Sequence, residues 1–252
     1  MLSYDNPIVV TGNSAAPATI AAVDMSANGS HAPGRVQVSQ AVATPTIGNG
    51  TADATLPVQE SGTTKSHHIF LVTGPAGVGK SSVAAYMSKG LNFPYIEGDE
   101  FHPLANVEKM SNGIPLTDAD RWDWLTALRE ESLRQIRAGS EGVVLTCSAL
   151  KQKYRDVIRV AGYFDHSLLI HFIYLSAPEE LLLERVRRRQ NHYMGANMVH
   201  SQFDILEPPG PNENDVISID VTRSLAEVQR DALDKALKII TMTNEQNPSA
   251  AK

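Results

Sequence analysis

Apolar residues collect in five short runs along residues 66–241, and these runs alternate with longer segments in which apolar residues recur every three or four positions. Near-continuous apolar runs are typical of buried parallel strands, and the longer period is typical of helices packed on one side. The five predicted strands are Ile69–Val72, Phe93–Ile96, Gly142–Cys147, Leu168–Leu175 and Val216–Asp220. This alternation predicts a three-layer α/β fold, in which helices cover both faces of a five-stranded parallel sheet.

One long helix is predicted over about 118–137. Thr117 and Asp120 have the spacing of a capping box at its start. At about 100° per residue one arc of this helix faces the core, and that arc holds Trp122, Leu125, Leu128, Leu133 and Ile136. Arg121 falls in the same arc, where a guanidinium must find an anion. An ion pair with Asp118 or another acid and a contact to an anionic substrate both meet this need, and the sequence leaves both open.

A glycine-rich loop of the pattern G-x-x-x-x-G-K-S joins the first strand to the next helix. Its glycines let backbone N–H groups turn toward phosphate oxygens, and the start of the helix adds positive partial charge. Lys80 is placed to reach the β- and γ-phosphates, and the Ser81 hydroxyl to bind Mg²⁺. The expected ATP-binding residues are Gly74, Pro75, Ala76, Gly77, Val78, Gly79, Lys80, Ser81 and Ser82. The dinucleotide pattern G-x-G-x-x-G is absent, so the expected ligand is a nucleoside triphosphate rather than NAD.

Two carboxylates follow the second predicted strand. Residues two apart on an extended chain face the same way, so Glu97 and Asp99 are expected to point together, with Gly98 allowing close approach. One carboxylate can order Mg²⁺ or its water shell while the other accepts a proton from an attacking hydroxyl, although an acidic surface loop has the same spacing. The strand 142–147 ends in Thr-Cys-Ser rather than in the aspartate of a Walker B strand. The acidic partner for Mg²⁺ must then come from elsewhere, which favours a functional role for Glu97 and Asp99.

Arginines crowd the segment 178–211, which begins with a helix after Pro178. Arg185 and Arg189 lie one turn apart on one face. A solvated basic face and a mobile lid whose arginines stabilise the transferring phosphoryl group both fit this pattern. Arg155, in an earlier helix, can either reach a ligand or pair with a neighbouring acid, and spacing does not decide between them.

Composition divides the chain of 252 residues unevenly. Residues 1–65 have Tyr4 as their only aromatic residue and no sustained apolar period, and are expected to be a disordered extension. Residues 66–241 are expected to be a single domain and residues 242–252 a frayed tail. The net charge of −6 argues against nucleic acid binding, and no run is long enough to cross a membrane. A lone cysteine, Cys147, and the lack of a secretory or transit signal at the start predict a cytoplasmic protein.

Several blocks of sequence resemble those of the small P-loop gluconokinases, in the same order and over about residues 69–240. They are Gly98-Asp99-Glu100-Phe101-His102-Pro103, Asn106-Val107-Glu108-Lys109-Met110, Gly113-Ile114-Pro115-Leu116, Asp118-Ala119-Asp120-Arg121, Cys147-Ser148-Ala149-Leu150-Lys151, Tyr154-Arg155-Asp156 and Ser201-Gln202-Phe203.

This resemblance implies an adenylate-kinase-like fold with a mobile lid, and transfer of phosphate from ATP to the 6-hydroxyl of D-gluconate. The product, 6-phosphogluconate, enters the pentose phosphate pathway. Asp99 and His102 are then expected to face the sugar acid, with Asp99 taking the hydroxyl proton. Arg121 and Arg155 would contact a carboxylate or phosphate. The residues expected to offset charge on the transferring group are Lys80, Arg185 and Arg189.

Two features depart from the family pattern. Glu97 stands where family members often have aspartate, and the N-terminal extension matches nothing in the family core. A homodimer is expected from the family alone. The alternatives are another small-metabolite kinase of the shikimate or adenylylsulfate type and a non-catalytic ATP-binding protein; a GTPase is disfavoured because no N-K-x-D motif occurs.

Overall fold

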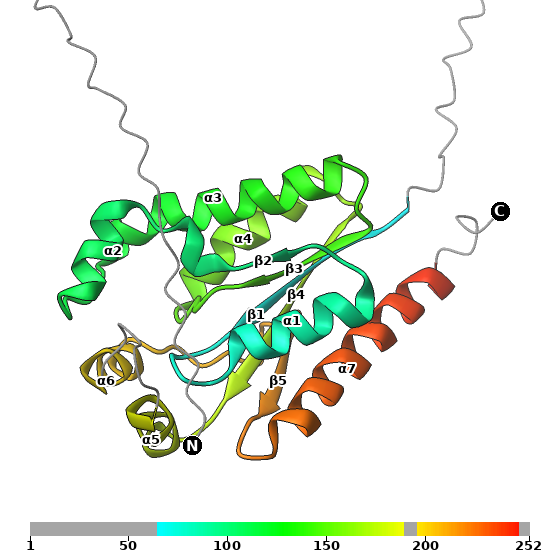
Figure 1. The fold of residues 1–252 in the computed structure, drawn as a ribbon. Coiled ribbons are helices and arrows are strands. Elements are labelled where there is room, and N and C mark those ends of the chain that lie inside the picture. The colour runs from blue at the N-terminus through cyan, green and yellow to red at the C-terminus, as the bar shows by residue number, and fades with distance from the viewer. Residues whose placement is uncertain (1–64, 189–195, 247–252) are drawn as a thin grey trace, which may run out of the picture. The chain divides into compact units, whose positions relative to one another are not determined.

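The computed structural model describes residues 65–188 and 196–246. Its sheet has five parallel strands in the order β2-β3-β1-β4-β5 (Figure 1). The strands are β1 His67–Thr73, β2 Tyr95–Ile96, β3 Gly142–Thr146, β4 Leu168–Ser176 and β5 Val216–Asp220. This confirms the α/β fold class and the five-stranded parallel sheet. The expected extension 1–65 lies outside the described residues except for Lys65, and so does Arg189.

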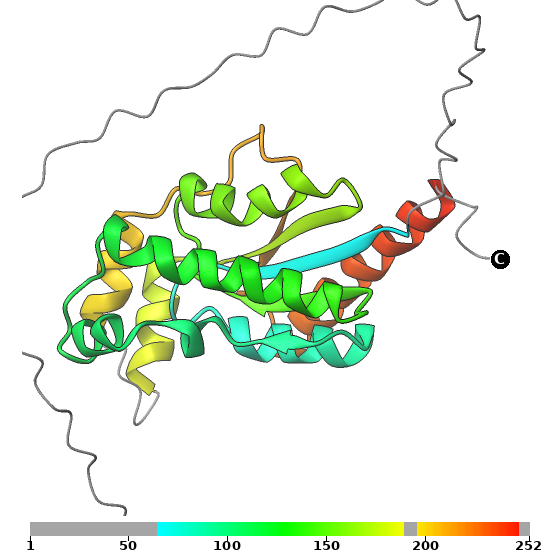
Figure 2. The same cartoon turned by 90° about the horizontal axis from the view of Figure 1, so that it is seen from above.

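Helices cover both faces of this sheet (Figures 1 and 2). On one face lie α1 (Lys80–Leu91) and α7 (Leu225–Gln246), and their core includes Phe70 of β1. On the other face lie α3 (Asp118–Arg137) and α4 (Gln152–Phe164), and their core includes Leu71, the next residue of β1. Because side chains alternate along a strand, β1 supplies both cores, and both faces are apolar as a central parallel strand requires.

Four further helices gather beyond the carboxyl ends of the strands (Figure 1). They are η1 (Gly98–Phe101), α2 (Leu104–Ser111), α5 (Glu179–Arg188) and α6 (Ala196–Asp204). In open parallel sheets, ligands bind at this edge. The predicted lid segment is therefore present here as α5 and α6, and its mobility stays a prediction.

The apolar arc of α3 differs from the expected one. Trp122 is 38% exposed, whereas Trp124 is 3% exposed and joins the core. The arc is centred nearer Arg121 and Leu125, which leaves Trp122 at its margin with its ring edge-on to Tyr154. The capping box is confirmed at the start of α3, where the Thr117 side chain accepts from the Asp120 N–H.

The closing helix is longer than expected. Residues 242–246, expected in a frayed tail, are the last turn of α7, and 247–252 lie outside the described residues. Within the described chain no helix combines the length and apolar character needed to cross a membrane.

Candidate active site

The phosphate-binding loop has the backbone that its glycines allow. Gly74, Gly77 and Gly79 have φ values of 133°, 82° and 100°, which L side chains rarely adopt, and α1 begins at the next residue, Lys80. A Cβ on Gly77 would lie 2.9 Å from Cγ2 of Val186 in α5, so the loop packs closely against that helix. Lys80 Nζ donates to the carbonyls of Gly74 (3.0 Å) and Pro75 (3.1 Å). A charged phosphate oxygen is a stronger acceptor than these carbonyls, so Lys80 can exchange them for a nucleotide.

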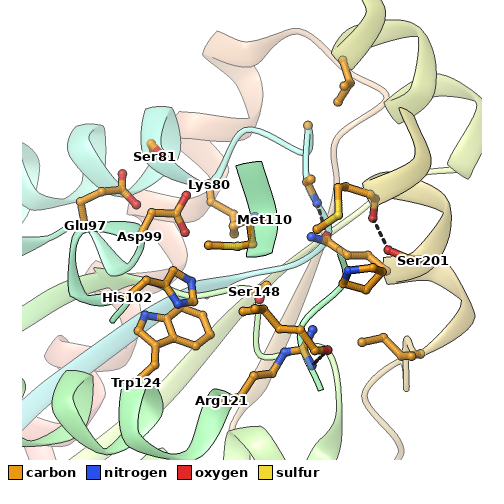
Figure 3. Close-up of a pocket in the computed structure, with 18 of the residues that line it drawn as sticks. Lys80, Ser81, Glu97, Asp99, His102, Met110, Arg121, Trp124, Ser148 and Ser201 are labelled. Carbon is orange, nitrogen blue, oxygen red and sulfur yellow. Dashed lines mark hydrogen bonds between the residues drawn. The ribbon is translucent and has the colours of Figure 1, made fainter. Parts of the chain in front are cut away.

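Gly98 fixes the position of the two predicted carboxylates. A Cβ at this residue would lie 1.9 Å from the carbonyl oxygen of Thr146, so only glycine allows the chain to pass β3 so closely. The Gly98 N–H donates to Thr146 Oγ1 (2.9 Å), and Trp124 Nε1 donates to the Gly98 carbonyl (2.7 Å). Glu97 and Asp99 lie side by side, next to Lys80 and Ser81 (Figure 3). The extended chain predicted for this step is not present, because Gly98 and Asp99 begin the 3-10 helix η1.

Glu97 is held as an ionised carboxylate. Its burial opposes ionisation, but hydrogen bonds from Thr146, Tyr95 and Ser81 outweigh this effect and lower the pKa of Glu97. The Tyr95 pKa is raised by burial and by the adjacent Glu97, which keeps its hydroxyl a donor. The Glu97 oxygens are therefore fixed beside the Ser81 hydroxyl at the start of α1.

His102 and Trp124 form one wall of the cavity (Figure 3). Their rings stack with centroids 4.0 Å apart. Burial lowers the pKa of His102 to about 4, so its imidazole is neutral at pH 7. Its Nδ1 is buried and has no hydrogen-bond partner among the described residues. A neutral imidazole can both donate to and accept from a hydroxyl, which suits a polyol substrate.

Arg121 reaches the same cavity from the first turn of α3 and is 9% exposed. Its Nη1 donates to the Leu116 carbonyl and to Tyr154 Oη (3.5 Å). The ion pair with Asp118 that the sequence left open does not form; Asp118 accepts instead from Tyr154, Lys151 and Lys153. No described carboxylate pairs with Arg121, so a buried cation faces the cavity and favours an anionic ligand.

Comparison with known proteins identifies the family. A family model described as an AAA domain matches residues 70–203. A probable gluconokinase from Schizosaccharomyces pombe is 46% identical over 174 residues, which cover 69% of this chain and 90% of that protein. The chain belongs to the gluconokinase family. The thermoresistant gluconokinase of Escherichia coli is 36% identical over 165 residues, covering 66% of this chain and 91% of that protein.

A solved structure supports the same family. The crystal structure of a gluconokinase from Sinorhizobium meliloti 1021 matches with a TM-score of 0.62 and 37% identity, covering 73% of this chain and 99% of that chain. The resemblance to the gluconokinase family that the sequence motifs indicated is therefore confirmed. The use of ATP follows from membership of this family of P-loop kinases.

The structure does not bring Arg155 to the cavity of this gluconokinase-family chain. Arg155 is 1% exposed, and its Nε and Nη2 donate to the two carboxylate oxygens of Glu213 (2.7 and 2.6 Å). Nη1 donates to the carbonyls of Ala149 (3.1 Å) and Glu207 (3.2 Å). Arg155 therefore has a structural position, linking α4 to the chain that follows α6, and the geometry does not support a substrate contact.

Arg185 also lies apart from the cavity that holds Asp99. Its Nη2 donates to the Val221 carbonyl (2.7 Å), and it lines a second cavity on the other side of the phosphate-binding loop, together with Arg223 and Gly77–Gly79. Its expected contact with the transferring phosphoryl group is not supported by this placement. The second cavity is suited instead to the nucleoside end of a nucleotide, because Arg side chains stack on aromatic bases.

The cavity also contains residues that the sequence reasoning did not select. They come from five separate helices and loops and are Met110, Leu116, Trp124, Ser148, Met198 and Gln202. Ser148 follows the carboxyl end of β3, so the rule that ligands bind at this sheet edge could have found it. Met110, Leu116 and Gln202 stand in the blocks that resemble the gluconokinase family, which marked these stretches but not their side chains. Trp124 and Met198 reach the cavity through the packing of α3 and α6.

Proposed function

We propose that this chain transfers the γ-phosphoryl group of ATP to the 6-hydroxyl of D-gluconate, giving 6-phospho-D-gluconate and ADP. The observation that carries the proposal is the pairing of groups in one cavity: Asp99 stands beside Lys80 and the phosphate-binding loop, and Arg121 stands on another wall with no carboxylate partner in the described chain (Figure 3). Gluconate has a hydroxyl at one end and a carboxylate at the other. These are the groups that such a cavity would bind.

The nucleotide lies along the phosphate-binding loop in this proposal. Its phosphates accept hydrogen bonds from the loop N–H groups at the start of α1, and Lys80 moves from the carbonyls of Gly74 and Pro75 to phosphate oxygens. The nucleoside extends into the second cavity beside Arg185 and Arg223, and the γ-phosphoryl group faces the cavity that contains Asp99. This arrangement places donor and acceptor on the two sides of Gly77–Gly79.

Transfer is then an in-line displacement. The 6-oxygen forms a bond to the γ-phosphorus as the bond to the β,γ-bridging oxygen breaks, Asp99 accepts the hydroxyl proton, and ADP leaves with the bridging oxygen. Lys80 and the loop N–H groups offset the charge on the phosphates. Gluconate is oriented by the Arg121 guanidinium at its carboxylate and by the neutral imidazole of His102 at its hydroxyls.

Ser81 and Glu97 are the residues that would hold Mg²⁺. Their hydroxyl and carboxylate oxygens are hard ligands of the kind that Mg²⁺ prefers, and Glu97 is ionised and fixed by its hydrogen bonds. No described group of three or more His, Cys, Asp and Glu residues is arranged to hold a metal ion by itself. Mg²⁺ in kinases needs only one or two protein ligands, and when bound it neutralises phosphate charge.

The assay that tests the function measures ADP release from Mg·ATP by the purified chain with D-gluconate, shikimate, adenylylsulfate, nucleoside monophosphates or no acceptor. Gluconate-dependent release with 6-phosphogluconate as product is expected. Release with a different acceptor would assign the chain to the alternative class of small-metabolite kinase. ATP binding without any acceptor-dependent release would indicate a non-catalytic nucleotide-binding protein.

Asp99→Asn tests the mechanism within that assay. Because the amide cannot accept the hydroxyl proton, turnover should fall by roughly 10²–10⁴-fold while ATP binding changes little. Measured kcat together with nucleotide affinity separates these effects. Unchanged turnover would exclude Asp99 as the proton acceptor.

The proposal also covers where the protein acts, its oligomeric state and the fate of its product. A cytoplasmic location fits the single cysteine, Cys147, which is buried and whose thiol pKa is raised by burial to about 12, so it is a protonated and unreactive thiol. A homodimer is proposed as a family-level expectation and is checked by light scattering during size-exclusion chromatography. The product would feed the pentose phosphate pathway.

A further inference from the structure

A hydrogen bond links the helix α6 to the phosphate-binding loop. The backbone N–H of Ala76 donates to Oε1 of Gln202 over 2.7 Å, between residues 126 positions apart in the chain. Both residues are 7% exposed, so the bond is shielded from solvent. A buried loop N–H in the phosphate-binding motif is thus satisfied by a side chain from the predicted lid segment.

The bond fixes which way the Gln202 carboxamide is turned. A backbone N–H can only donate, so the atom that faces Ala76 must be the oxygen, and the amide nitrogen with its two N–H groups must point elsewhere. No described residue accepts a hydrogen bond from Nε2, and Gln202 lines the cavity that contains Lys80 and Asp99. Two hydrogen-bond donors are therefore available to a ligand at the phosphate-binding loop.

The side chain is held in place by the packing of its helix. On α6, Val199 is fully buried in the core that also contains Val186 of α5 and Ala76 of the loop. Met198 packs with Met110 of α2 and with Leu116 in a smaller buried cluster. Contacts on both sides keep α6 against the loop, so the donors of Gln202 are oriented before a ligand binds.

We propose that Gln202 is a catalytic residue that donates hydrogen bonds from Nε2 to the γ-phosphoryl group of ATP while its Oε1 stays anchored on the Ala76 N–H. The γ-phosphoryl group is the specific target because Gln202 lines the acceptor cavity with Asp99, whereas the second cavity, with Arg185, takes the nucleoside. Oriented donors at the transferring group stabilise the charge on its oxygens. The inference rests on the proposed transfer from ATP, but not on gluconate as the acceptor.

The test compares two nucleotides that differ in the γ-phosphoryl group. Calorimetry without acceptor gives the affinities of Mg·ADP and of the β,γ-imido analogue of ATP for the wild type, Gln202→Met and Gln202→Glu. Gln202→Met removes both hydrogen-bonding functions at similar volume, and the analogue should bind roughly 10-fold more weakly while ADP changes by less than about twofold. With gluconate, kcat should fall on the order of 10²-fold.

Gln202→Glu separates anchoring from catalysis. Its carboxylate can still accept from the Ala76 N–H, but it replaces the donors by a negative charge beside the phosphates, so the analogue should bind still more weakly than to Gln202→Met. The link to α6 is retained, and this variant therefore remains informative if Gln202→Met does not fold. Wild-type kinetics in Gln202→Glu, or equal weakening of both nucleotides in either variant, would show that Gln202 only anchors the helix.

Gln135→Met is the matched control. The Gln135 carboxamide donates to Glu131 within α3 (2.8 Å) and lies outside both cavities, so the same substitution there should leave both affinities and kcat unchanged. If the wild type phosphorylates another acceptor, the gluconate assignment fails, and the ratio of analogue to ADP affinity still decides the role of Gln202. If the wild type binds neither nucleotide, both proposals are overturned.

Discussion

Two buried arginines differ in what surrounds them. Arg121 at the start of α3 is 9% exposed and Arg155 at the start of α4 is 1% exposed, and the sequence suggested a substrate contact for both. All N–H groups of Arg155 are directed at Glu213 and at two backbone carbonyls. The Nη1 of Arg121 reaches one carbonyl and one hydroxyl, with no described carboxylate.

This difference separates a structural arginine from a binding one. A buried guanidinium that is paired and fully hydrogen-bonded has no capacity left for a ligand, and removing one partner leaves the other as an uncompensated charge. A buried guanidinium that lacks a carboxylate and lines a cavity is instead completed by an anion that binds there. Burial alone therefore does not identify a substrate contact; the balance of charge around the group does.

The largest expected effect is on stability, from Arg155→Met. The substitution leaves the Glu213 carboxylate, whose side chain is 3% exposed, without its bidentate partner. The free energy of unfolding should fall by roughly 3–4 kcal/mol, because the buried carboxylate keeps only one arginine hydrogen bond, from Arg159 Nη2 (2.8 Å). Urea unfolding monitored by circular dichroism measures the change.

The double variant Arg155→Met with Glu213→Leu is the control. It removes both charges and should recover much of the lost stability. Equal destabilisation by the single and the double variant would mean that the ion pair is not the source of the effect. A normally stable Arg155→Met that fails to bind gluconate would reverse the structural assignment of Arg155.

Arg121→Met is expected to lower activity rather than stability. Removing the guanidinium takes away the group proposed to bind the substrate carboxylate, so kcat/KM for gluconate should fall by about 10²–10³-fold, the usual loss for a buried charged contact. The KM for ATP and the unfolding midpoint should change little. Steady-state kinetics with gluconate varied at saturating ATP measures the loss.

Arg121→Lys sharpens this prediction. A lysine keeps the charge but not the planar fork that binds a carboxylate through two hydrogen bonds, so it should recover only part of the activity. If Arg121→Met instead unfolds at much lower urea, as expected for Arg155→Met, then Arg121 is structural and the comparison between the two arginines fails.

The sequence predicted the features that depend on short spacings. The phosphate-binding loop is defined by glycines at fixed positions. Glu97 and Asp99 were expected to point together from an extended chain, but Asp99 lies in the short 3-10 helix η1, where Gly98 passes close to Thr146. The order of strands along the chain likewise follows from local hydrophobic patterns. The loop and the order of the strands need no knowledge of distant contacts, and the structure has them where they were expected, whereas the approach of Gly98 to Thr146 is a contact between residues 48 positions apart.

Hydrogen-bond partners that lie far apart in the sequence could not be predicted in this way. Glu213 lies 58 residues after Arg155, and Gln202 lies 126 residues after Ala76, so both pairs depend on how α4, α6 and the connecting chain pack. Trp124 was missed for a different reason: an arc of 100° steps is broad enough to admit Trp122 at its edge, and only packing decides which indole is buried.

A smaller effect on the free energy of unfolding is expected when the pH is lowered and Glu213 is protonated. The hydrogen bond from Arg155, opposed by burial and reinforced by Arg159, lowers the pKa of Glu213 from its ordinary 4.5 to about 2. The folded carboxylate thus binds a proton less readily than the unfolded one, so its contribution to stability is complete above pH 4.5 and is lost as pH falls toward 2. That contribution should be about 3 kcal/mol.

Glu213→Gln isolates this contribution from that of other acids. The variant is less stable at neutral pH, but its free energy of unfolding should decline less steeply than that of the wild type between pH 4.5 and 2.5. Urea unfolding at several pH values gives both slopes. Parallel slopes would show that Glu213 titrates normally and that Arg155 does not hold it as a paired carboxylate.

The smallest effect is expected at the start of the helix that carries Arg121. Thr117→Ala removes the hydroxyl that accepts from the Asp120 N–H and should lower the free energy of unfolding by about 1 kcal/mol, whereas Thr117→Ser should preserve it. Gluconate kinetics should change little, because Arg121 is also held by the Leu116 carbonyl and Tyr154. A loss of activity in Thr117→Ala as large as that in Arg121→Met would mean that the cap, rather than these contacts, sets the guanidinium position.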